Sequence, residues 1–131
     1  MEALHIEGNE LYPRVILDPS EAKFEISGKS MPVDAHEFYI PILNWIKEYI
    51  KAPLEETEFD FRLDYFNTPS IKRILFLLFQ LKELDNSKHK VKIKWHYRED
   101  DDDLWELGRD LSVMSDLPFM FLEYPVPSCK I

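Results

Sequence analysis

The segment Asn67-Thr68-Pro69-Ser70 places two hydroxyl side chains between a strand-like run and a helix-like run. Protein kinases modify such hydroxyls, and a phosphate adds roughly −1.5 to −2 charge units at neutral pH. A hydroxyl can instead cap a helix, because its oxygen accepts a hydrogen bond from an amide of the first turn. Two interpretations of Thr68 are therefore open: it is a helix cap alone, or it is also an acceptor for phosphate.

Pro69 indicates that a helix begins at this segment. Proline is tolerated at the first helical position, because the amide hydrogen that it lacks would have no partner there. We expect Thr68 to be the N-cap and Pro69 to be the first helical residue. A phosphate on Thr68 would face free amides and the positive end of the helix dipole, so the site would tolerate modification without unfolding.

The other reactive side chains form no catalytic or metal-binding pattern. The four histidines lack the spacing of metal ligands, and Cys129 has no histidine near it in the sequence. The acidic run from Glu99 to Asp103 lacks the glycine and the spaced oxygen ligands of a calcium loop, and it suits a helix N-terminus. Three dispersed glycines cannot form a phosphate loop. We expect no catalytic residues, no metal site and no cofactor.

The charge and the apolar runs restrict the class of partner and the compartment. A net charge of −9 opposes binding to nucleic acid or to anionic lipid. The start of the chain lacks the pattern of a signal peptide, and the longest apolar run, Ile74 to Phe79, is far shorter than the roughly 20 residues of a membrane span. A single cysteine fits a reducing compartment. We therefore expect a cytoplasmic protein without membrane insertion.

Six segments have the alternation or the composition of β-strands. The clearest is Glu58 to Phe66, in which aromatic and leucine side chains alternate with charged ones. We expect strands at Leu4 to Ile6, Arg14 to Leu17, Ala22 to Ser27, Glu58 to Phe66, Val91 to Tyr97 and Phe119 to Tyr124. Gly28 is expected to end the third of these strands.

Three segments between these strands have the period of a helix. The first follows Asp34, a good N-cap, but it contains Pro41, which costs about 3 kcal/mol inside a helix. Its regular part therefore begins near Phe38 or bends there. The second helix follows Pro69, with Ile71, Ile74, Leu75 and Leu78 expected to face inward, and the third begins in the acidic run and reaches Met114.

The order of these elements predicts one domain over residues 1–131. Strands joined by helices of this length are typical of an α/β or α+β sandwich, here a mixed sheet of about five to six strands with about three helices packed on it. The strands Glu58 to Phe66 and Val91 to Tyr97 are joined by one helix, so we expect them to be parallel.

Three long segments resemble a known bacterial family. They are EFYIPILNWIKEYI (Glu37 to Ile50), FRLDYFNTPSIKRILFLLFQL (Phe61 to Leu81) and VKIKWHYREDDDDLWELGRDL (Val91 to Leu111), and the start HIEG adds to them. The chain resembles the SiaC-like regulatory phosphoproteins, which are similar in layout to the STAS domains of anti-sigma factor antagonists. The resemblance covers most of the chain and implies a STAS-like single domain.

The resemblance implies a non-enzymatic switch controlled by phosphorylation. The threonine after the asparagine is the reversible phosphoacceptor of the family, which corresponds to Thr68. Relatives commonly carry a serine where this chain has Pro69, so Ser70 is the remaining local competitor. Asn67, Pro69 and Ser70 would then shape recognition by the kinase or the partner.

The partners implied are a serine/threonine kinase, a metal-dependent phosphatase and a target of the unmodified form. One type of target in the family is a diguanylate cyclase, and a target of that type would give this chain a role in cyclic-di-GMP signalling, which the residues themselves do not specify. The alternative is a constitutive structural or oligomeric module, in which Thr68 is only a helix cap. Such a module would not respond to phosphorylation at Thr68.

Overall fold

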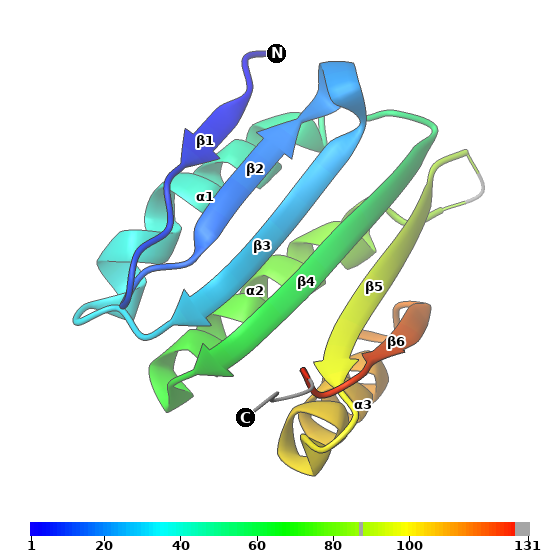
Figure 1. The fold of residues 1–131 in the computed structure, drawn as a ribbon. Coiled ribbons are helices and arrows are strands. Elements are labelled where there is room, and N and C mark those ends of the chain that lie inside the picture. The colour runs from blue at the N-terminus through cyan, green and yellow to red at the C-terminus, as the bar shows by residue number, and fades with distance from the viewer. Residues whose placement is uncertain (87, 128–131) are drawn as a thin grey trace.

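The computed structural model describes residues 1–86 and 88–127, in which six strands form one mixed sheet in the order of the chain (Figure 1). The first three strands are antiparallel, and the last four are parallel. The strands are β1 (Leu4–Ile6), β2 (Arg14–Asp18), β3 (Lys23–Ser30), β4 (Glu56–Phe66), β5 (Lys90–Arg98) and β6 (Phe119–Tyr124). The helices are α1 (Ala35–Tyr49), α2 (Thr68–Leu84) and α3 (Asp102–Ser115). The expected α/β fold and the parallel pairing of β4 with β5 are confirmed.

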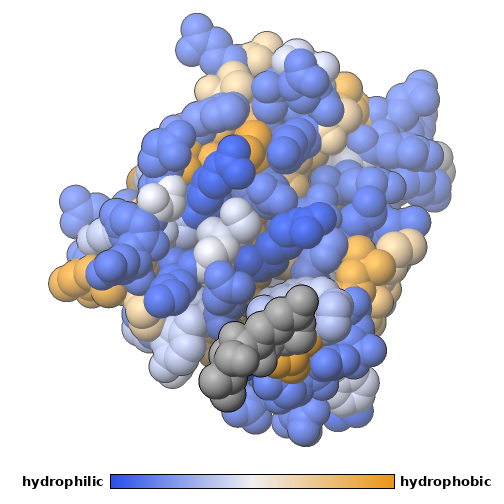
Figure 2. All heavy atoms as spheres, viewed as in Figure 1, coloured by the Kyte–Doolittle hydropathy of each residue, from blue (hydrophilic) through white to orange (hydrophobic). Residues whose placement is uncertain are grey.

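The helices cover one face of the sheet and leave the other open. Along β4 the buried side chains alternate with more exposed ones, and the buried set is Thr57, Phe59, Phe61 and Leu63. Figure 1 shows α1 and α2 behind the sheet, and Figure 2 shows mostly hydrophilic residues on the face toward the viewer. This open face carries ion pairs between neighbouring strands, such as Glu58 with Lys94 at 2.9 Å.

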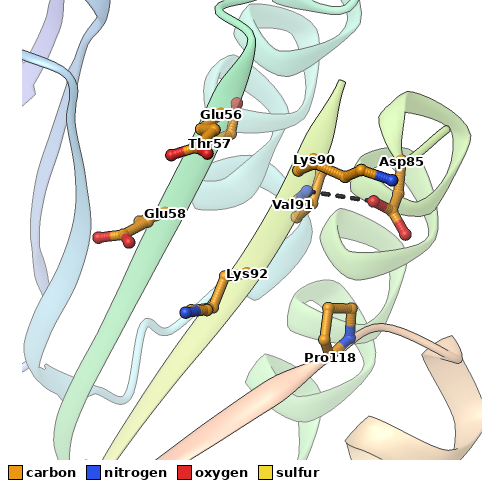
Figure 3. Close-up of a pocket in the computed structure, with 8 residues that line it drawn as sticks. All are labelled: Glu56, Thr57, Glu58, Asp85, Lys90, Val91, Lys92 and Pro118. Atoms are coloured by element: carbon orange, nitrogen blue, oxygen red, sulfur yellow. Dashed lines mark hydrogen bonds between the residues drawn. The ribbon is translucent and has the colours of Figure 1, made fainter. Parts of the chain in front are cut away.

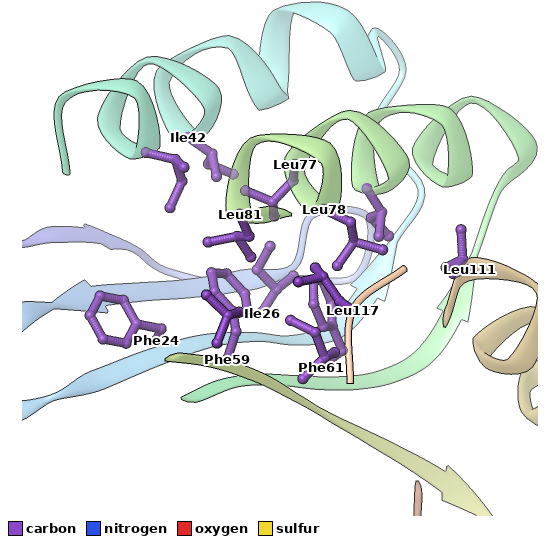
Figure 4. Packing of buried hydrophobic residues seen from close by; sticks show 14 of the residues in the cluster. Phe24, Ile26, Ile42, Phe59, Phe61, Leu77, Leu78, Leu81, Leu111 and Leu117 are labelled. Carbon is purple, nitrogen blue, oxygen red and sulfur yellow. The ribbon is translucent and has the colours of Figure 1, made fainter. Parts of the chain in front are cut away.

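The core lies between this sheet and the helices. Figure 4 shows side chains of α1 and α2 above side chains of the sheet, among them Ile42, Leu77, Leu78, Leu81, Phe24, Ile26, Phe59 and Phe61. Ile74 and Leu78 of α2 are fully buried, and Ile71 and Leu75 are half-buried against the same core. The predicted inward face of this helix is therefore confirmed.

The prediction that Gly28 ends the third strand is wrong. β3 continues to Ser30, because a bulge between Gly28 and Lys29 shifts the register against β4 without breaking the pairing. Gly28 has a φ of +93°, which residues with a side chain rarely adopt. The bulge brings Ser30 opposite Phe66, at the end of β4.

The starts of α1 and α3 follow the predicted capping pattern. The side chain of Asp34 accepts a hydrogen bond from the amide of Glu37, and α1 begins at Ala35 with Pro41 inside it. The Pro41 ring is exposed, so the helix accommodates it on the solvent side rather than beginning at Phe38. In the acidic run, Asp101 caps α3.

Gly108→Ala should destabilise the fold, although alanine is the better helix former. A Cβ at this position of α3 would lie 2.5 Å from Cδ1 of the buried Trp95 ring, whose Nε1 donates to Leu104 O at 3.0 Å. Overpacking costs about 1–3 kcal/mol, against about 1 kcal/mol gained in helix propensity. Urea unfolding should show a lower free energy of unfolding. The exposed control Asp110→Ala should change it by less than about 0.5 kcal/mol, and a Gly108→Ala protein as stable as wild type would contradict the packing.

Candidate functional site

The N-cap of α2 is Asn67. Its Oδ1 accepts a hydrogen bond from the amide of Ser70 at 3.1 Å, in the geometry of a cap. The helix begins at Thr68, and Pro69 occupies its second position. The prediction that Thr68 caps the helix is therefore wrong, and so is the version of the alternative function in which Thr68 serves only as a cap.

Backbone pairing explains why Asn67 takes this role. The amide of Asn67 donates to Ser30 O at 2.9 Å, which ties the residue to the end of β3. Its Nδ2 also donates to Pro32 O at 3.4 Å. Asparagine is at least as good an N-cap as threonine. The helix therefore gains nothing by beginning one residue later with Thr68 as its cap.

A chain of buried hydroxyl groups lies directly beneath this helix start. Ser30 and Ser70 are fully buried, and so is Tyr39 of α1. Tyr39 OH lies 2.6 Å from Ser30 Oγ, Ser30 Oγ lies 2.9 Å from Ser70 Oγ, and Ser70 Oγ lies 2.6 Å from Asn67 Oδ1. Ser70 Oγ also lies 3.0 Å from Ser30 O. Since each hydroxyl has one proton, the consistent direction of donation runs from Tyr39 through Ser30 to Ser70, which donates to Asn67 Oδ1 or to Ser30 O.

Tyr39 must keep its proton to donate at the head of this chain. Burial raises the pKa of Tyr39 to about 12, while the hydrogen bonds to Ser30 and Ser70 oppose the shift. The phenol is therefore neutral at physiological pH. The chain joins the end of β3, the first turns of α1 and the start of α2 into one rigid junction.

The junction gives the two candidate hydroxyls opposite environments. Ser70 is buried, and its oxygen is held within the hydroxyl chain. Thr68 is exposed, and its hydroxyl forms no hydrogen bond with residues 1–86 or 88–127. Pro69 is exposed and Asn67 is half-buried. The Thr68 hydroxyl is accessible on the folded surface, whereas access to the Ser70 hydroxyl requires the junction to open.

The helix that begins at Thr68 carries no acidic residue over its first fifteen positions. Residues 65–82 form the longest segment of the chain without Asp or Glu. Lys72 lies one turn after Thr68 on the same side of the helix, with Arg73 beside it. Both cations lie over the ring of Phe76, at 5.8 and 5.5 Å, and neither forms a salt bridge with a carboxylate of the described residues.

A surface cleft of about 510 Å³ separates the starts of α1 and α2 next to Thr68. It is lined by Val33, Asp34, Ala35, His36, Pro69, Lys72 and Arg73. Val33 is 88% exposed, and Phe76 and Phe79 expose about two fifths of their surface farther along α2. On the α2 side, apolar and basic side chains therefore lie near the exposed hydroxyl, while Asp34 lines the α1 side of the cleft. Sequence reasoning did not single out Lys72 and Arg73, although the four-residue spacing from Thr68 to Lys72 was a readable signal.

The helix start offers a phosphate fewer amides than expected. Pro69 has no N–H, and the N–H of Ser70 is taken by Asn67. A phosphate on Thr68 would therefore interact mainly with the helix dipole and with Lys72.

A second cavity lies at the opposite ends of β4 and β5 (Figure 3). Its volume is about 360 Å³, and its lining mixes carboxylates with lysines: Glu56, Thr57, Glu58, Asp85, Lys90, Val91, Lys92 and Pro118. Asp85 Oδ1 accepts from the amide of Val91 at 3.1 Å, so this carboxylate completes the strand edge. The hydrogen bond from Lys94 lowers the pKa of Glu58. No nucleophile and base are paired among these residues.

The described residues hold neither a cluster of metal ligands nor a helix that could span a membrane. Within residues 1–86 and 88–127, no three His, Cys, Asp or Glu side chains converge on a position for a metal ion. His96 Nε2 lies 2.7 Å from Asp60 Oδ1 on the open sheet face. Cys129 lies outside the described residues. In that same part of the chain, every helix is too short or too polar to cross a bilayer.

Comparison with known proteins gives consistent matches over nearly the whole chain. The profile described as "SiaC family regulatory phosphoprotein" matches residues 6–124. An uncharacterized protein of Pseudomonas aeruginosa strain UCBPP-PA14 (PA14_02130) is 28% identical over 119 residues, which cover 91% of this chain and 94% of that protein.

Solved structures give the same relation. The crystal structure of apo-SiaC from Pseudomonas aeruginosa has a TM-score of 0.83 and 28% identity, over 93% of this chain and 99% of that one. SiaC in the complex of the diguanylate cyclase SiaD with its activator SiaC, from the same organism, has a TM-score of 0.85 and 26% identity, over 92% and 99% of the chains.

Alanine substitution should separate the two neighbouring residues of the helix start. Asn67→Ala removes the cap and should lower the free energy of unfolding by about 0.5–2 kcal/mol. Thr68→Ala removes an exposed hydroxyl that has no hydrogen-bond partner among the described residues, and it should change the free energy of unfolding by less than about 0.5 kcal/mol. Urea unfolding of both variants measures the difference. A larger loss in Thr68→Ala than in Asn67→Ala would return the capping role to Thr68.

The buried phenol should make the protein less stable at alkaline pH. Between pH 10 and about 12 the unfolded chain loses the Tyr39 proton while the folded protein keeps it. The free energy of unfolding should therefore fall as the pH rises, by up to about 1.4 kcal/mol per pH unit from this residue. Tyr39→Phe should show a shallower fall in denaturation from about pH 9 to 11. The exposed control Tyr65→Phe should retain the wild-type slope, and equal slopes in all three proteins would contradict the assignment.

Proposed function

This chain belongs to the SiaC family of regulatory phosphoproteins, and from that membership we propose that it is a non-enzymatic switch whose signal is a phosphate on Thr68. In the unmodified form it binds a target protein, and the phosphorylated form releases that target. A serine/threonine kinase adds the phosphate and a metal-dependent phosphatase removes it.

The observation that carries this proposal is the exposed hydroxyl of Thr68 above a junction that does not need it. Asn67 supplies the cap, and Ser70 with Ser30 supplies the buried hydrogen bonds. Modification of Thr68 therefore breaks no structural contact in the described residues. A phosphate at the first turn of α2 is also favoured by the helix dipole.

The surface around Thr68 supports a docking role. The exposed Lys72 and Phe76 and the half-buried Arg73 form a basic and apolar surface next to the cleft between α1 and α2. A phosphate would place two negative charges there and would require desolvation on binding. The target is then released because the phosphate repels acidic groups of the target and because removing water from the phosphate costs free energy on binding. No change of fold is needed.

We assign the target to the diguanylate cyclases. SiaC of Pseudomonas aeruginosa is the activator of the diguanylate cyclase SiaD with which it forms a complex, and its fold matches this chain with a TM-score of 0.85. By the same relation, the unmodified chain would activate a diguanylate cyclase from its own host. Its part in cyclic-di-GMP signalling is thus that of a regulator.

Substitutions of Thr68 should separate the phosphate signal from the stability of the fold. Thr68→Asp keeps a favourable residue at the first helical position and adds one negative charge, so it should remain folded and bind the host diguanylate cyclase at least tenfold more weakly. Thr68→Ser keeps an acceptor hydroxyl, so it should bind like wild type and lose affinity when phosphorylated. Thermal unfolding beside a binding titration measures both properties.

Two controls fix the interpretation of this experiment. Thr68→Ala should bind in a manner that does not respond to the kinase. Asp110→Asn changes an exposed charge on α3 and should leave the titration unchanged. The switch is refuted if phosphorylated wild type and Thr68→Asp, both folded, bind the cyclase as tightly as the unmodified protein. That result would favour a constitutive interaction module.

A further inference from the structure

One long edge of the sheet has backbone groups that the described residues leave unpaired. β6 is the last strand of the sheet, and its only partner in residues 1–86 and 88–127 is β5. The amide of Ile93 donates to Pro118 O at 2.9 Å, and the amide of Glu99 donates to Tyr124 O at 2.9 Å. Even-numbered residues of β6 therefore point their backbone groups toward β5. By the alternation of a parallel ladder, Phe119, Phe121 and Glu123 point theirs outward.

This edge lacks the usual protection of an exposed strand. Natural edge strands are shortened, bent by a bulge, or blocked by charged side chains, especially lysine, or by proline. β1, at the other edge, has three residues. β6 has six, FMFLEY, with neither lysine nor proline and with one charged residue, Glu123, next to its end, and it pairs with β5 without a register shift. The edge of β5 beyond β6 is covered, because Asp85 accepts the hydrogen bond of the Val91 amide. Unlike β1 and the start of β5, β6 can therefore pair with a further strand through its outward backbone groups.

We propose that β6 is a self-association edge, which pairs antiparallel with β6 of a second copy and joins the two sheets. The outward groups are symmetric about Phe121. A twofold axis at this residue places Phe121 opposite its own copy and Phe119 opposite Glu123. This register uses the outward N–H and C=O of all three residues, whereas a shift by one pair on either side loses a third of these bonds.

Side chains favour the same register. Met120, which is 40% exposed, lies opposite Leu122 of the other copy, so both meet an apolar neighbour. The only charged side chain of the strand, Glu123, faces Phe119 and not a second carboxylate. A register centred on Glu123 would oppose two carboxylates, which is unfavourable. The edge is therefore complementary to itself, which is the requirement for a twofold dimer.

The size of the edge predicts a weak dimer. Six residues on each side bury less than a standard interface of roughly 1,600 Å². Each copy also carries a net charge of −9, so the two copies repel each other at long range. Association should therefore strengthen as salt screens this repulsion.

Sedimentation equilibrium from about 5 to about 500 µM tests the proposal with the full chain. Wild type should show a monomer–dimer equilibrium that shifts toward dimer at higher salt. Glu123→Pro removes an outward N–H but no bond to β5, and it should weaken dimerisation at least tenfold. Glu123→Ala keeps the N–H and should dimerise at least as well as wild type. Thermal unfolding establishes that both variants are folded.

The outcomes separate this proposal from the phosphate switch. Thr68 follows β4, and β5 lies between β4 and β6 (Figure 1), so Thr68→Asp should dimerise like wild type. A monomer throughout the concentration range overturns the proposal. So does a folded Glu123→Pro protein that dimerises like wild type, since pairing through β6 cannot survive a proline ring at that edge. Neither result affects the role of Thr68.

Discussion

The buried chain of hydroxyls from Tyr39 through Ser30 and Ser70 to Asn67 is the interaction on which the arrangement of this molecule depends. It crosses three elements that are distant in the sequence, and every oxygen in it has a partner. In an apolar interior, an unpaired hydroxyl costs about 1–3 kcal/mol, so the chain is stable only when β3, α1 and α2 all keep their places. The exposed Thr68 derives its fixed position from this buried arrangement.

The sheet is covered by helices on one face only, and the distribution of polar groups explains this arrangement. Three helices are enough to cover one face, and the alternation of each strand sends its charged residues to the other. Cross-strand ion pairs such as Glu25 with Arg62 and Glu58 with Lys94 balance charges there. The surface that we propose to be regulatory is consequently not on the sheet but at the start of α2, where β4 leads into this helix. The wide polar face of the sheet is left in contact with water.

Local pattern was sufficient to predict most of the fold. Apolar residues alternate in β4 and β5 and follow helical spacing in α2, because one face of each element is buried. A window of a few residues is enough to recognise either period. The errors came from contacts that no local window contains. Gly28 does not end β3, because pairing with β4 carries the strand past a bulge. Asn67 replaces Thr68 as the cap because its amide is held by Ser30, which lies 37 positions earlier. The burial of Ser70 has the same origin, since its partner Ser30 is separated from it by 40 positions.

The absence of acidic residues from residues 65–82 has a consequence for the kinetics of recognition. On a protein of net charge −9, an acidic partner is repelled from most directions and meets the least resistance over this helix. In the proposed switch, the surface would thus act as an approach path as well as a contact. Charges at the rim of an interface act chiefly on the rate of encounter, while desolvated contacts act on the lifetime of the complex. In the switch that we propose, a phosphate at the start of α2 would close that path, so a modified molecule would no longer compete for the target at the stage of encounter.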